Sequence, residues 1–349
     1  MFDKITVSFP GLGIDPFSLN KIAFSIGKFE VRWYGVIITC GIILAFLYAF
    51  YRGKNNEGVA MDDVIDVGLV TVLMGIAGAR LYYVLTTLDS GIYESFYDVI
   101  AIWNGGLAIY GGIIGGCLGI LLMCHIKRIR WQKLFDMIAP GVVIAQSLGR
   151  WGNFFNGEAY GYAIEETTRY YFFTTEHILP SGEGTLFHAL RMGLGYKAVT
   201  GYYHPTFLYE SLWNLVGFVL IHLLYKHKKF DGQVALMYFT WYGFGRMFIE
   251  GFRTDSLYVP GTEFLRISQC VGLLCFLGGA VLLTVFLIRA KGKPYVFAVQ
   301  AANATVETTQ ETRQTEAEKT ENEAAPEEVE TAENNPTEDT EETQNGKID

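Results

Sequence analysis

The sequence predicts an all-α integral membrane protein with seven transmembrane helices, and three observations lead to this fold class. Half of the 349 residues are hydrophobic, 15 % are aromatic and 39 are glycine, a composition more apolar than that of ordinary soluble domains. The apolar residues gather in runs that approach the roughly 20 residues needed to cross a bilayer. The net charge of −9 is unevenly divided, because residues 301–349 carry 15 of the 36 acidic residues and 3 of the 27 basic ones.

Seven apolar runs define a membrane domain over residues 1–300. We expect its helices at 34–51, 64–85, 107–125, 134–149, 207–225, 234–251 and 267–288. The fourth run is the weakest, since Asp136, Pro140 and Gln146 interrupt it. Before the first helix, the loose alternation of apolar residues over 22–31 is consistent with a short strand or interfacial ribbon. No cleavable signal peptide is expected at the start of the chain.

The basic residues near the helix ends predict the orientation of the domain. Twelve of them fall in alternate connections and after the last helix: Arg52, Lys54, Lys127, Arg128, Arg130, Lys133, Lys226, Lys228, Lys229, Arg289, Lys291 and Lys293. The opposite short connections hold no base between Thr86 and Gly106, and two, Arg253 and Arg266, between the last two helices. We therefore expect the twelve to face the cytoplasm, with the N-terminus outside and the C-terminus cytoplasmic.

Two segments lie outside the predicted helices. The connection 150–206 is too long for a simple turn and rich in Tyr and Phe, so we expect a small outward-facing cap on the outer leaflet. Residues 301–349 are rich in Glu, Thr and Asn and predict a disordered acidic cytoplasmic tail. Deleting the chain after about Tyr295 is expected to leave the activity intact.

Ionisable groups inside membrane helices are costly and mark candidate functional positions. Those within or at the ends of the predicted spans are Arg80, Asp136, Arg150, Glu210, Arg246 and Glu250. Arg80 and Asp136 are as consistent with ion pairs that hold helices together as with function. Arg246 and Glu250 are spaced i, i+4 on one helix face, and Gly243 and Gly245 leave space there for a backbone or a lipid headgroup. A guanidinium suits a phosphate because its planar fork donates two parallel hydrogen bonds.

The densest polar cluster runs from Arg150 through Asn153, Asn156 and Glu158 to Gly161. These side chains need polar partners at the end of a membrane helix, and a bound lipid headgroup would supply them. A structured loop is the alternative interpretation.

Two further segments contain candidate residues. In the glycine-rich run after Gly105, the glycines at spacing four are typical of close helix packing, and Tyr110 is the one side chain positioned to point a hydroxyl into a cavity. His204 precedes the fifth helix, which carries Glu210 near its start, and a structural role for this histidine is the alternative to a binding one. The cysteines form no CxxC and the histidines no metal-ligand spacing, so we expect no metal, no cofactor and no nucleic-acid partner.

In order along the chain, these segments resemble the prolipoprotein diacylglyceryl transferases of bacterial inner membranes. The matching pieces are Arg32-Trp33-Tyr34-Gly35, the glycine run Trp103 to Gly116, Arg150 to Gly161, His204-Pro205 to Glu210, and Tyr242-Gly243 through Arg253. They span about residues 20–290, and the order Arg-x-Gly-Asn-x-x-Asn-x-Glu-x-x-Gly from Arg150 is specific.

The resemblance implies transfer of the diacylglyceryl group of phosphatidylglycerol to the lipobox cysteine of a preprolipoprotein signal peptide, with glycerol phosphate released. It implies that Arg150 contacts the headgroup. It also implies that activity depends on Tyr34, Asn153, Glu158, Gly161, Arg246 and Glu250. Many members carry a proposed base, His, where this chain has Tyr110, and a tyrosine of pKa about 10 is a poor base near neutral pH. We therefore expect Tyr110 to orient substrate.

Two other functional classes fit a multi-spanning chain with charges in its helices. One is a lipid transporter or flippase, although we find no repeated halves of the kind common in transporters. The other is a non-catalytic lipid-binding scaffold, in which the arginines hold anionic headgroups without reaction.

Overall fold

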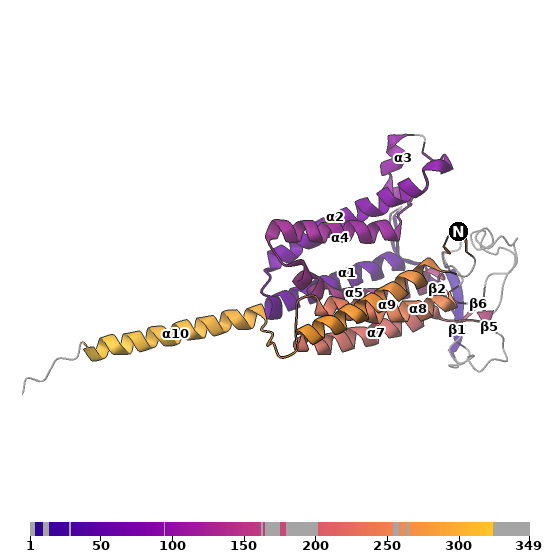
Figure 1. Cartoon of the computed structure of the whole chain (residues 1–349). Coiled ribbons are helices and arrows are strands. Elements are labelled where there is room, and N and C mark those ends of the chain that lie inside the picture. Colours follow the sequence, from indigo (N-terminus) through magenta and orange to yellow (C-terminus); the bar gives the residue numbers. More distant parts are fainter. Residues whose placement is uncertain are drawn as a thin grey trace, which may run out of the picture. The chain divides into compact units, whose positions relative to one another are not determined.

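Seven long helices occupy the seven apolar runs of the sequence (Figure 1). In the computed structural model they are α1 (Trp33–Arg52), α2 (Met61–Thr86), α4 (Ile109–Lys127), α5 (Trp131–Asn156), α7 (Thr206–Leu224), α8 (Gln233–Ile249) and α9 (Ile267–Arg289). A short helix, α3 (Phe96–Ile100), lies between α2 and α4. The structure describes residues 4–9, 14–27, 29–93, 95–161, 163–164, 175–178, 202–253, 258–259, 261–262 and 265–323.

Five of these helices are long and apolar enough to cross a membrane: α1, α2, α4, α7 and α9. The helices predicted there are confirmed, and their length and composition agree with the prediction that these five cross the membrane. Helix α8 has 17 residues, and α5 contains the buried Asp136 and the internal Pro140. For α5 and α8 the membrane crossing stays a prediction.

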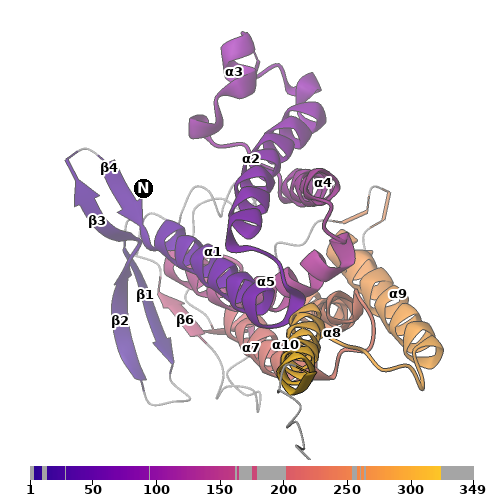
Figure 2. The ribbon, with the colours of Figure 1, turned by 90° about the vertical axis from the view of Figure 1, so that its left-hand side faces the viewer.

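Helix α5 lies at the centre of the bundle and packs against α1, α7 and α8 (Figure 2). Helices α2 and α4 form a close pair beside it, because small residues let their backbones approach. A Cβ added to Gly111 would lie 2.3 Å from the Gly78 carbonyl oxygen, and one added to Gly115 would lie 2.2 Å from that of Met74. The predicted packing role of these glycines is therefore confirmed.

The prediction of an all-α fold is wrong at the end of the bundle where α5 ends and α7 begins. Strands β1 (Lys4–Phe9), β2 (Ile14–Asn20), β5 (Ala163–Ile164), β6 (Thr175–Ile178) and β7 (Tyr202–Tyr203) form a sheet in the order β2-β1-β6-β7-β5. Val7 of β1 is fully buried and packs with Phe154 and Phe207. The sequence pattern missed this sheet because its strands are short and β1 pairs with a strand some 170 residues later.

A second β element precedes α1, where the sequence predicts a strand or ribbon. Strands β3 (Ile22–Ile26) and β4 (Phe29–Arg32) form an antiparallel hairpin. Gly27 at its tip has a φ of 62°, a left-handed conformation that glycine adopts without steric cost. This prediction is confirmed.

The predicted cap 150–206 starts too early. Helix α5 continues through Asn156, so the first seven residues of that range belong to the helix. Gly157, with a φ of 64°, is where the helix ends, so the alternative interpretation as a structured loop is wrong for residues 150–156. Of the cap aromatics, Tyr162 and residues 170–173 lie outside the described residues, and the placement on a leaflet stays a prediction.

The chain divides into two compact units, Met1–Gln300 and Ala301–Asp349. The prediction of disorder from Ala301 is wrong for residues 301–323, which belong to helix α10 (Ala298–Glu323). Ala, Glu, Gln and Lys are good helix formers, and threonine hydroxyls bond back to the carbonyl four residues earlier, as from Thr308 to Ala304 at 2.8 Å. Residues 324–349 lie outside the described residues.

A buried charge cluster joins the helices at the other end of the bundle. The Lys228 ammonium has no solvent exposure and lies 2.8 Å from Glu57, 2.9 Å from Asp136 and 3.2 Å from Asp231. Burial alone would lower the pKa of Lys228, but the charges of Asp136 and Glu57 outweigh it and the pKa lies above its ordinary value. Asp136 also accepts the amides of Gly232 and Ala235 at the start of α8. These contacts support the structural interpretation of Asp136, in which its charge holds helices together.

Candidate active site

Three helices meet at a network of charged side chains centred on Glu210 of α7. Glu210 Oε1 lies 2.5 Å from Nη2 of Arg150 on α5, and Oε2 lies 3.1 Å from Nη1 of Arg246 on α8. Nη2 of Arg246 lies 2.7 Å from Oε2 of Glu250, one helical turn further on. Four charged residues predicted from the sequence are therefore in contact.

The arginines and the carboxylates of this network differ in exposure. The Glu210 and Glu250 side chains are 4 % and 2 % exposed, whereas those of Arg150 and Arg246 are 19 % and 15 % exposed. The carboxylates therefore lie beneath the guanidinium groups. An anion approaching the network meets the arginines first.

Two arginines that the sequence did not single out as candidates complete the network. Arg253 Nε lies 3.9 Å from Glu250 Oε2, and the Arg266 guanidinium donates a hydrogen bond to the backbone carbonyl of Glu250. Their signal in the sequence was their isolation, as the two basic residues in the connection between the last two helices.

The polar segment after Arg150 is organised around the Glu158 carboxylate. Asn153 Nδ2 and Asn156 Nδ2 donate to Glu158 Oε1 at 3.0 and 3.2 Å. The Glu158 amide donates to the Asn153 carbonyl at 3.1 Å, so the chain folds back over the helix end. Asn153 Oδ1 lies 3.4 Å from Arg150 Nη1, which links this segment to the Glu210 network.

Tyr34 reaches the same region from the start of α1. Its ring lies on Gly152 of α5, where an added Cβ would be 2.8 Å from Tyr34 Cδ2. The glycine between Arg150 and Asn153 therefore admits an aromatic ring from another helix. The structure brings Tyr34 together with the Arg150–Gly161 segment. The dependence of activity on Tyr34, which the resemblance implies, stays a prediction.

Gly161 and His204 hold two chain segments together beside α7. The Gly161 amide donates to the His204 carbonyl at 2.8 Å, and Gly161 forms an isolated β-bridge with Arg253. His204 Nδ1 lies 3.2 Å from the Tyr209 hydroxyl, and burial lowers the pKa of His204. These contacts agree with the structural alternative for His204. Its predicted role in substrate binding stays a prediction.

Tyr110 is the one predicted site residue that the structure leaves apart from these contacts. It starts α4, at the same end of the bundle as the end of α5 (Figure 1). Its ring lies 6.5 Å from that of Tyr82 on α2, measured between centroids. Within the described part of the chain, no hydrogen bond, ion pair or ring contact joins Tyr110 to the Glu210 network.

Gly243 and Gly245 admit protein instead of a headgroup. An added Cβ at Gly243 would lie 2.6 Å from the Gly272 carbonyl oxygen of α9, and one at Gly245 would lie 2.1 Å from the indole nitrogen of Trp213 on α7. Of the two expected occupants, the backbone is confirmed at Gly243, while a side chain fills the space at Gly245. These glycines position α8, and with it Arg246.

The contacts of Arg80 also support a structural role for this residue. Its guanidinium donates to the carbonyls of Asp98, Val99, Gly105 and Gly106 at 2.5–3.0 Å. It therefore fixes the connection between α2 and α4, and no ion pair with another helix is needed to explain it.

Comparison with known proteins decides the family. The profile described as prolipoprotein diacylglyceryl transferase matches residues 21–285. The chain belongs to this family. Phosphatidylglycerol–prolipoprotein diacylglyceryl transferases from Lactobacillus delbrueckii subsp. bulgaricus and Lactobacillus acidophilus are 40 % and 41 % identical to it, covering 80 % and 76 % of this chain and 95 % and 89 % of their own length. The phosphatidylglycerol–prolipoprotein diacylglyceryl transferase 1 of Clostridium perfringens is 40 % identical to this chain, and the alignment covers 79 % of this chain and 97 % of that enzyme.

Membership of the diacylglyceryl transferase family confirms the resemblance seen in the sequence. The match covers the helix bundle except for the last residues of α9 and ends before residue 301. The Glu210 network and the Arg150–Gly161 segment fall within it. The acidic unit after Gln300 falls outside.

Proposed function

We propose that this protein transfers the diacylglyceryl group of phosphatidylglycerol to the thiol of a lipobox cysteine in a preprolipoprotein signal peptide. The sulfur forms a thioether bond to the carbon of the diacylated glycerol that carries the phosphate. The carbon–oxygen bond to that phosphate breaks, and glycerol phosphate leaves. The reaction is the first step of lipoprotein maturation and takes place at the bacterial inner membrane.

The observation that carries this proposal is the pair of guanidinium groups, Arg150 and Arg246, that share the Glu210 carboxylate and are more exposed than it is. A guanidinium suits a phosphate anion because its planar fork donates two parallel hydrogen bonds. The phosphodiester of phosphatidylglycerol is such an anion, and both substrates are membrane-anchored, so a site between helices suits them.

The proposed mechanism places Arg150 on the lipid headgroup and Arg246 on the departing phosphate. The leaving phosphate gains negative charge as the carbon–oxygen bond breaks, and fixed guanidinium groups stabilise that charge without reorganising. A cysteine thiol of pKa about 8.5 already supplies some thiolate near neutral pH, and nearby arginines increase that fraction. The thiol proton therefore leaves to solvent or to the phosphate before or during attack.

The other site residues orient these groups. Glu210 and Glu250 hold the arginines, while Asn153, Asn156 and Glu158 shape the segment that follows Arg150. Tyr34 packs on that segment, Gly161 and His204 join it to the start of α7, and Tyr110 orients the substrate. In the proposed topology, with seven crossing helices, this end of the bundle faces outward, where exported acceptors emerge.

The test is a reconstituted reaction. Purified protein is mixed with phosphatidylglycerol vesicles and a lipobox peptide, and the peptide is analysed by mass spectrometry. A diacylglyceryl thioether on the cysteine supports the proposal, and its absence with folded protein refutes it. Movement of lipid between leaflets without a thioether would indicate a flippase, and lipid binding alone would indicate a scaffold.

A further inference from the structure

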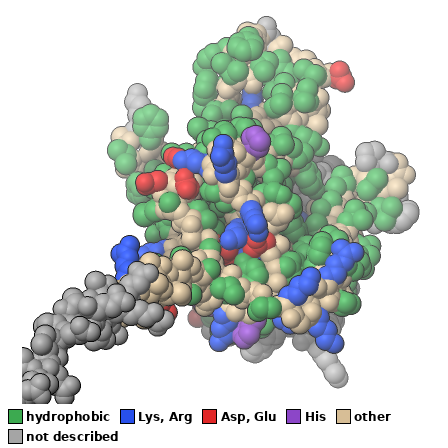
Figure 3. Space-filling view, turned by 60° about the vertical axis from the view of Figure 1, so that its left-hand side comes forward, with side chains coloured by type: hydrophobic (Ala, Val, Ile, Leu, Met, Phe, Trp, Pro, Cys, Tyr) green, Lys and Arg blue, Asp and Glu red, His purple; other side chains and the backbone are tan. Residues whose placement is uncertain are grey.

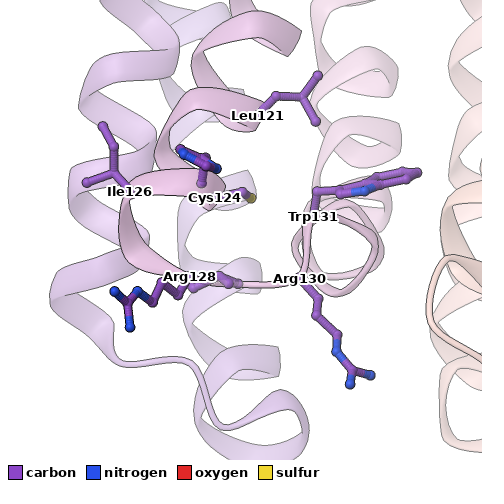
Figure 4. Close-up of a pocket in the computed structure, with 8 residues that line it drawn as sticks. Leu121, Cys124, Ile126, Arg128, Arg130 and Trp131 are labelled. Carbon is purple, nitrogen blue, oxygen red and sulfur yellow. The ribbon is translucent and has the colours of Figure 1, made fainter.

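A second cationic surface lies at the opposite end of α5 from Arg150. An open pocket of about 830 Å³ surrounds the turn between α4 and α5, and Leu121, His125, Arg128, Arg130 and Trp131 are among its lining residues. Figure 4 shows Arg128 and Arg130 extending away from the turn, with Leu121 further along α4. Because Arg150 follows Trp131 by 19 residues in one helix, the two places are about 29 Å apart at 1.5 Å per residue.

We propose that this pocket binds one anionic glycerophospholipid from the membrane leaflet at this end of the bundle. Its phosphate lies on Arg128, and its acyl chains lie along the outer face of α4. The site is distinct from the proposed transferase site and does not depend on transfer. In the proposed topology the leaflet is the cytoplasmic one.

The backbone of Arg128 shows that this position is not occupied by its most favourable residue. Arg128 ends α4 with φ 54° and ψ 33°, a left-handed conformation that is unfavourable for an L-residue with a side chain and that glycine usually adopts at helix ends. The amides of Arg128 and Ile129 still donate to the His125 and Cys124 carbonyls at 3.4 and 3.0 Å. The turn therefore needs a left-handed residue but no arginine side chain, and a strained residue of this kind points to function.

The charge of Arg128 is available to a ligand. The neighbouring Lys127 is neutralised by Asp63 at 3.0 Å and Asp66 at 2.5 Å, and Arg130 lies 3.4 Å from Asp231. Within the described residues, neither the Arg128 guanidinium nor the His125 imidazole forms a hydrogen bond or ion pair. Arg128 therefore differs from a basic residue that only completes a surface ion pair.

The surroundings of Arg128 suit a lipid better than a soluble anion. Leu118, Leu121, Leu122 and Ile126 of α4 are 53, 42, 47 and 59 % exposed, and Trp131 is 50 % exposed. Aromatic rings of this kind favour the level of the headgroups, and basic pockets at helix ends bind anionic headgroups. Figure 3 shows Lys and Arg side chains with a histidine among apolar side chains on this face. A phosphate with two acyl chains matches both parts of the surface.

The test uses the full-length protein in nanodiscs of phosphatidylcholine that contain a small fraction of photoactivatable phosphatidylglycerol. After illumination, peptides are mapped by mass spectrometry. We expect labelling of the peptide that contains residues 118–131, reduced at least fivefold in Arg128→Gly and unchanged in Lys291→Gln, an exposed base elsewhere on the expected cytoplasmic side. Excess unlabelled phosphatidylglycerol should compete, while phosphatidylcholine and free inorganic phosphate should not.

Arg128→Gly relieves the left-handed strain, so its thermal unfolding midpoint should equal or exceed that of the parent. If that variant fails to fold, Arg128→Asn serves instead, since asparagine tolerates this conformation. Equal labelling of a folded Arg128 variant, or competition by phosphatidylcholine, would overturn the proposal. Competition by inorganic phosphate alone would show an anion site and also overturn it. Failure of thioether formation in the reconstituted reaction would leave this labelling result unaffected.

Discussion

The Arg150 guanidinium and the Glu210 carboxylate form an ion pair between α5 and α7, with Nη2 2.5 Å from Oε1. The second oxygen of the same carboxylate lies 3.1 Å from Arg246 Nη1. One buried carboxylate therefore fixes the separation of two guanidinium groups from two further helices. In the proposed mechanism, that separation decides whether both arginines reach the same phosphate.

Replacing Glu210 should therefore affect the chemistry strongly. We expect Glu210→Gln to lower the rate of thioether formation by about 100-fold, or about 2.7 kcal/mol, because the neutral amide loses both ion pairs. Removal of one partner from a buried pair also costs about 3–5 kcal/mol of stability, so the thermal midpoint should fall. Glu30→Gln, on the exposed strand β4, is the control. A rate for Glu210→Gln within twofold of the parent would contradict the prediction.

Arg246 and Tyr110 should differ sharply in their effects. We expect Arg246→Ala to reduce thioether formation by about 10²–10³-fold, as loss of a charge-stabilising donor does in other enzymes. Tyr110→Phe should retain activity within about tenfold, because the ring that faces Tyr82 is kept and the hydroxyl is no efficient base. Initial rates at matched protein abundance measure both. Complete loss of activity in Tyr110→Phe would show that its hydroxyl takes part in the reaction.

The contact of Tyr34 with Gly152 can be tested by adding a methyl group at Gly152 of α5, with Gly149 of the same helix as the control. In Gly152→Ala the new methyl would lie 2.8 Å from Tyr34 Cδ2, whereas Gly149→Ala meets nothing within 4 Å. We expect Gly152→Ala to lower activity at least tenfold by displacing Tyr34, and Gly149→Ala to keep it, since alanine is the better helix former. Rates and thermal midpoints of the two variants are compared. Equal activities would show that the position of Tyr34 is unimportant.

The burial of His204 predicts that the stability of the protein depends on pH. Burial lowers the pKa of His204 below its usual 6.5, so the folded protein binds this proton less tightly than the unfolded chain. Because the unfolded chain binds this proton more tightly, the free energy of unfolding is highest above pH 6.5 and decreases as the pH falls below that value. We expect the thermal midpoint to fall more between pH 7.5 and 5.5 in the parent than in His204→Gln. Parallel curves for the two proteins would exclude His204 as the cause.

The sequence predicted the helices well because most of the apolar runs are long and continuous, and even the interrupted fourth run forms the helix α5. It could not predict the sheet, since Val7 of β1 lies opposite His177 of β6, and short polar strands carry no signal for a partner so distant. The helical part of the tail was missed for another reason. Its composition argued against a core, but residues such as Ala298 to Thr312 form a helix without one.

The site residues were predictable as a set, and their contacts were not. The positions of Arg150, Glu210 and Arg246 followed from the cost of charge in apolar runs, yet the sharing of one carboxylate depends on how three helices pack. The role of Gly245 was misjudged for the same reason, because Trp213 comes from a different helix. Arg253 lay within a motif that the sequence identified, but its contact with Glu250 depends on the chain turn after α8.

We expect the part of the chain that is needed for activity to extend beyond Tyr295, where the sequence analysis placed its end. The sequence suggested that everything after about Tyr295 is dispensable, but Phe297 is 6 % exposed and its ring stacks on Tyr225 with centroids 6.2 Å apart. Loss of a buried phenylalanine costs about 3–5 kcal/mol. We therefore expect truncation after Gln300 to keep transferase activity and thermal midpoint, and truncation after Tyr295 to lower both. Full-length Phe297→Ala should reproduce the loss in midpoint, because Phe297, and not the acidic unit, is what the shorter truncation removes from the core. Identical midpoints for the two truncated chains would show that the Tyr225–Phe297 contact adds no stability.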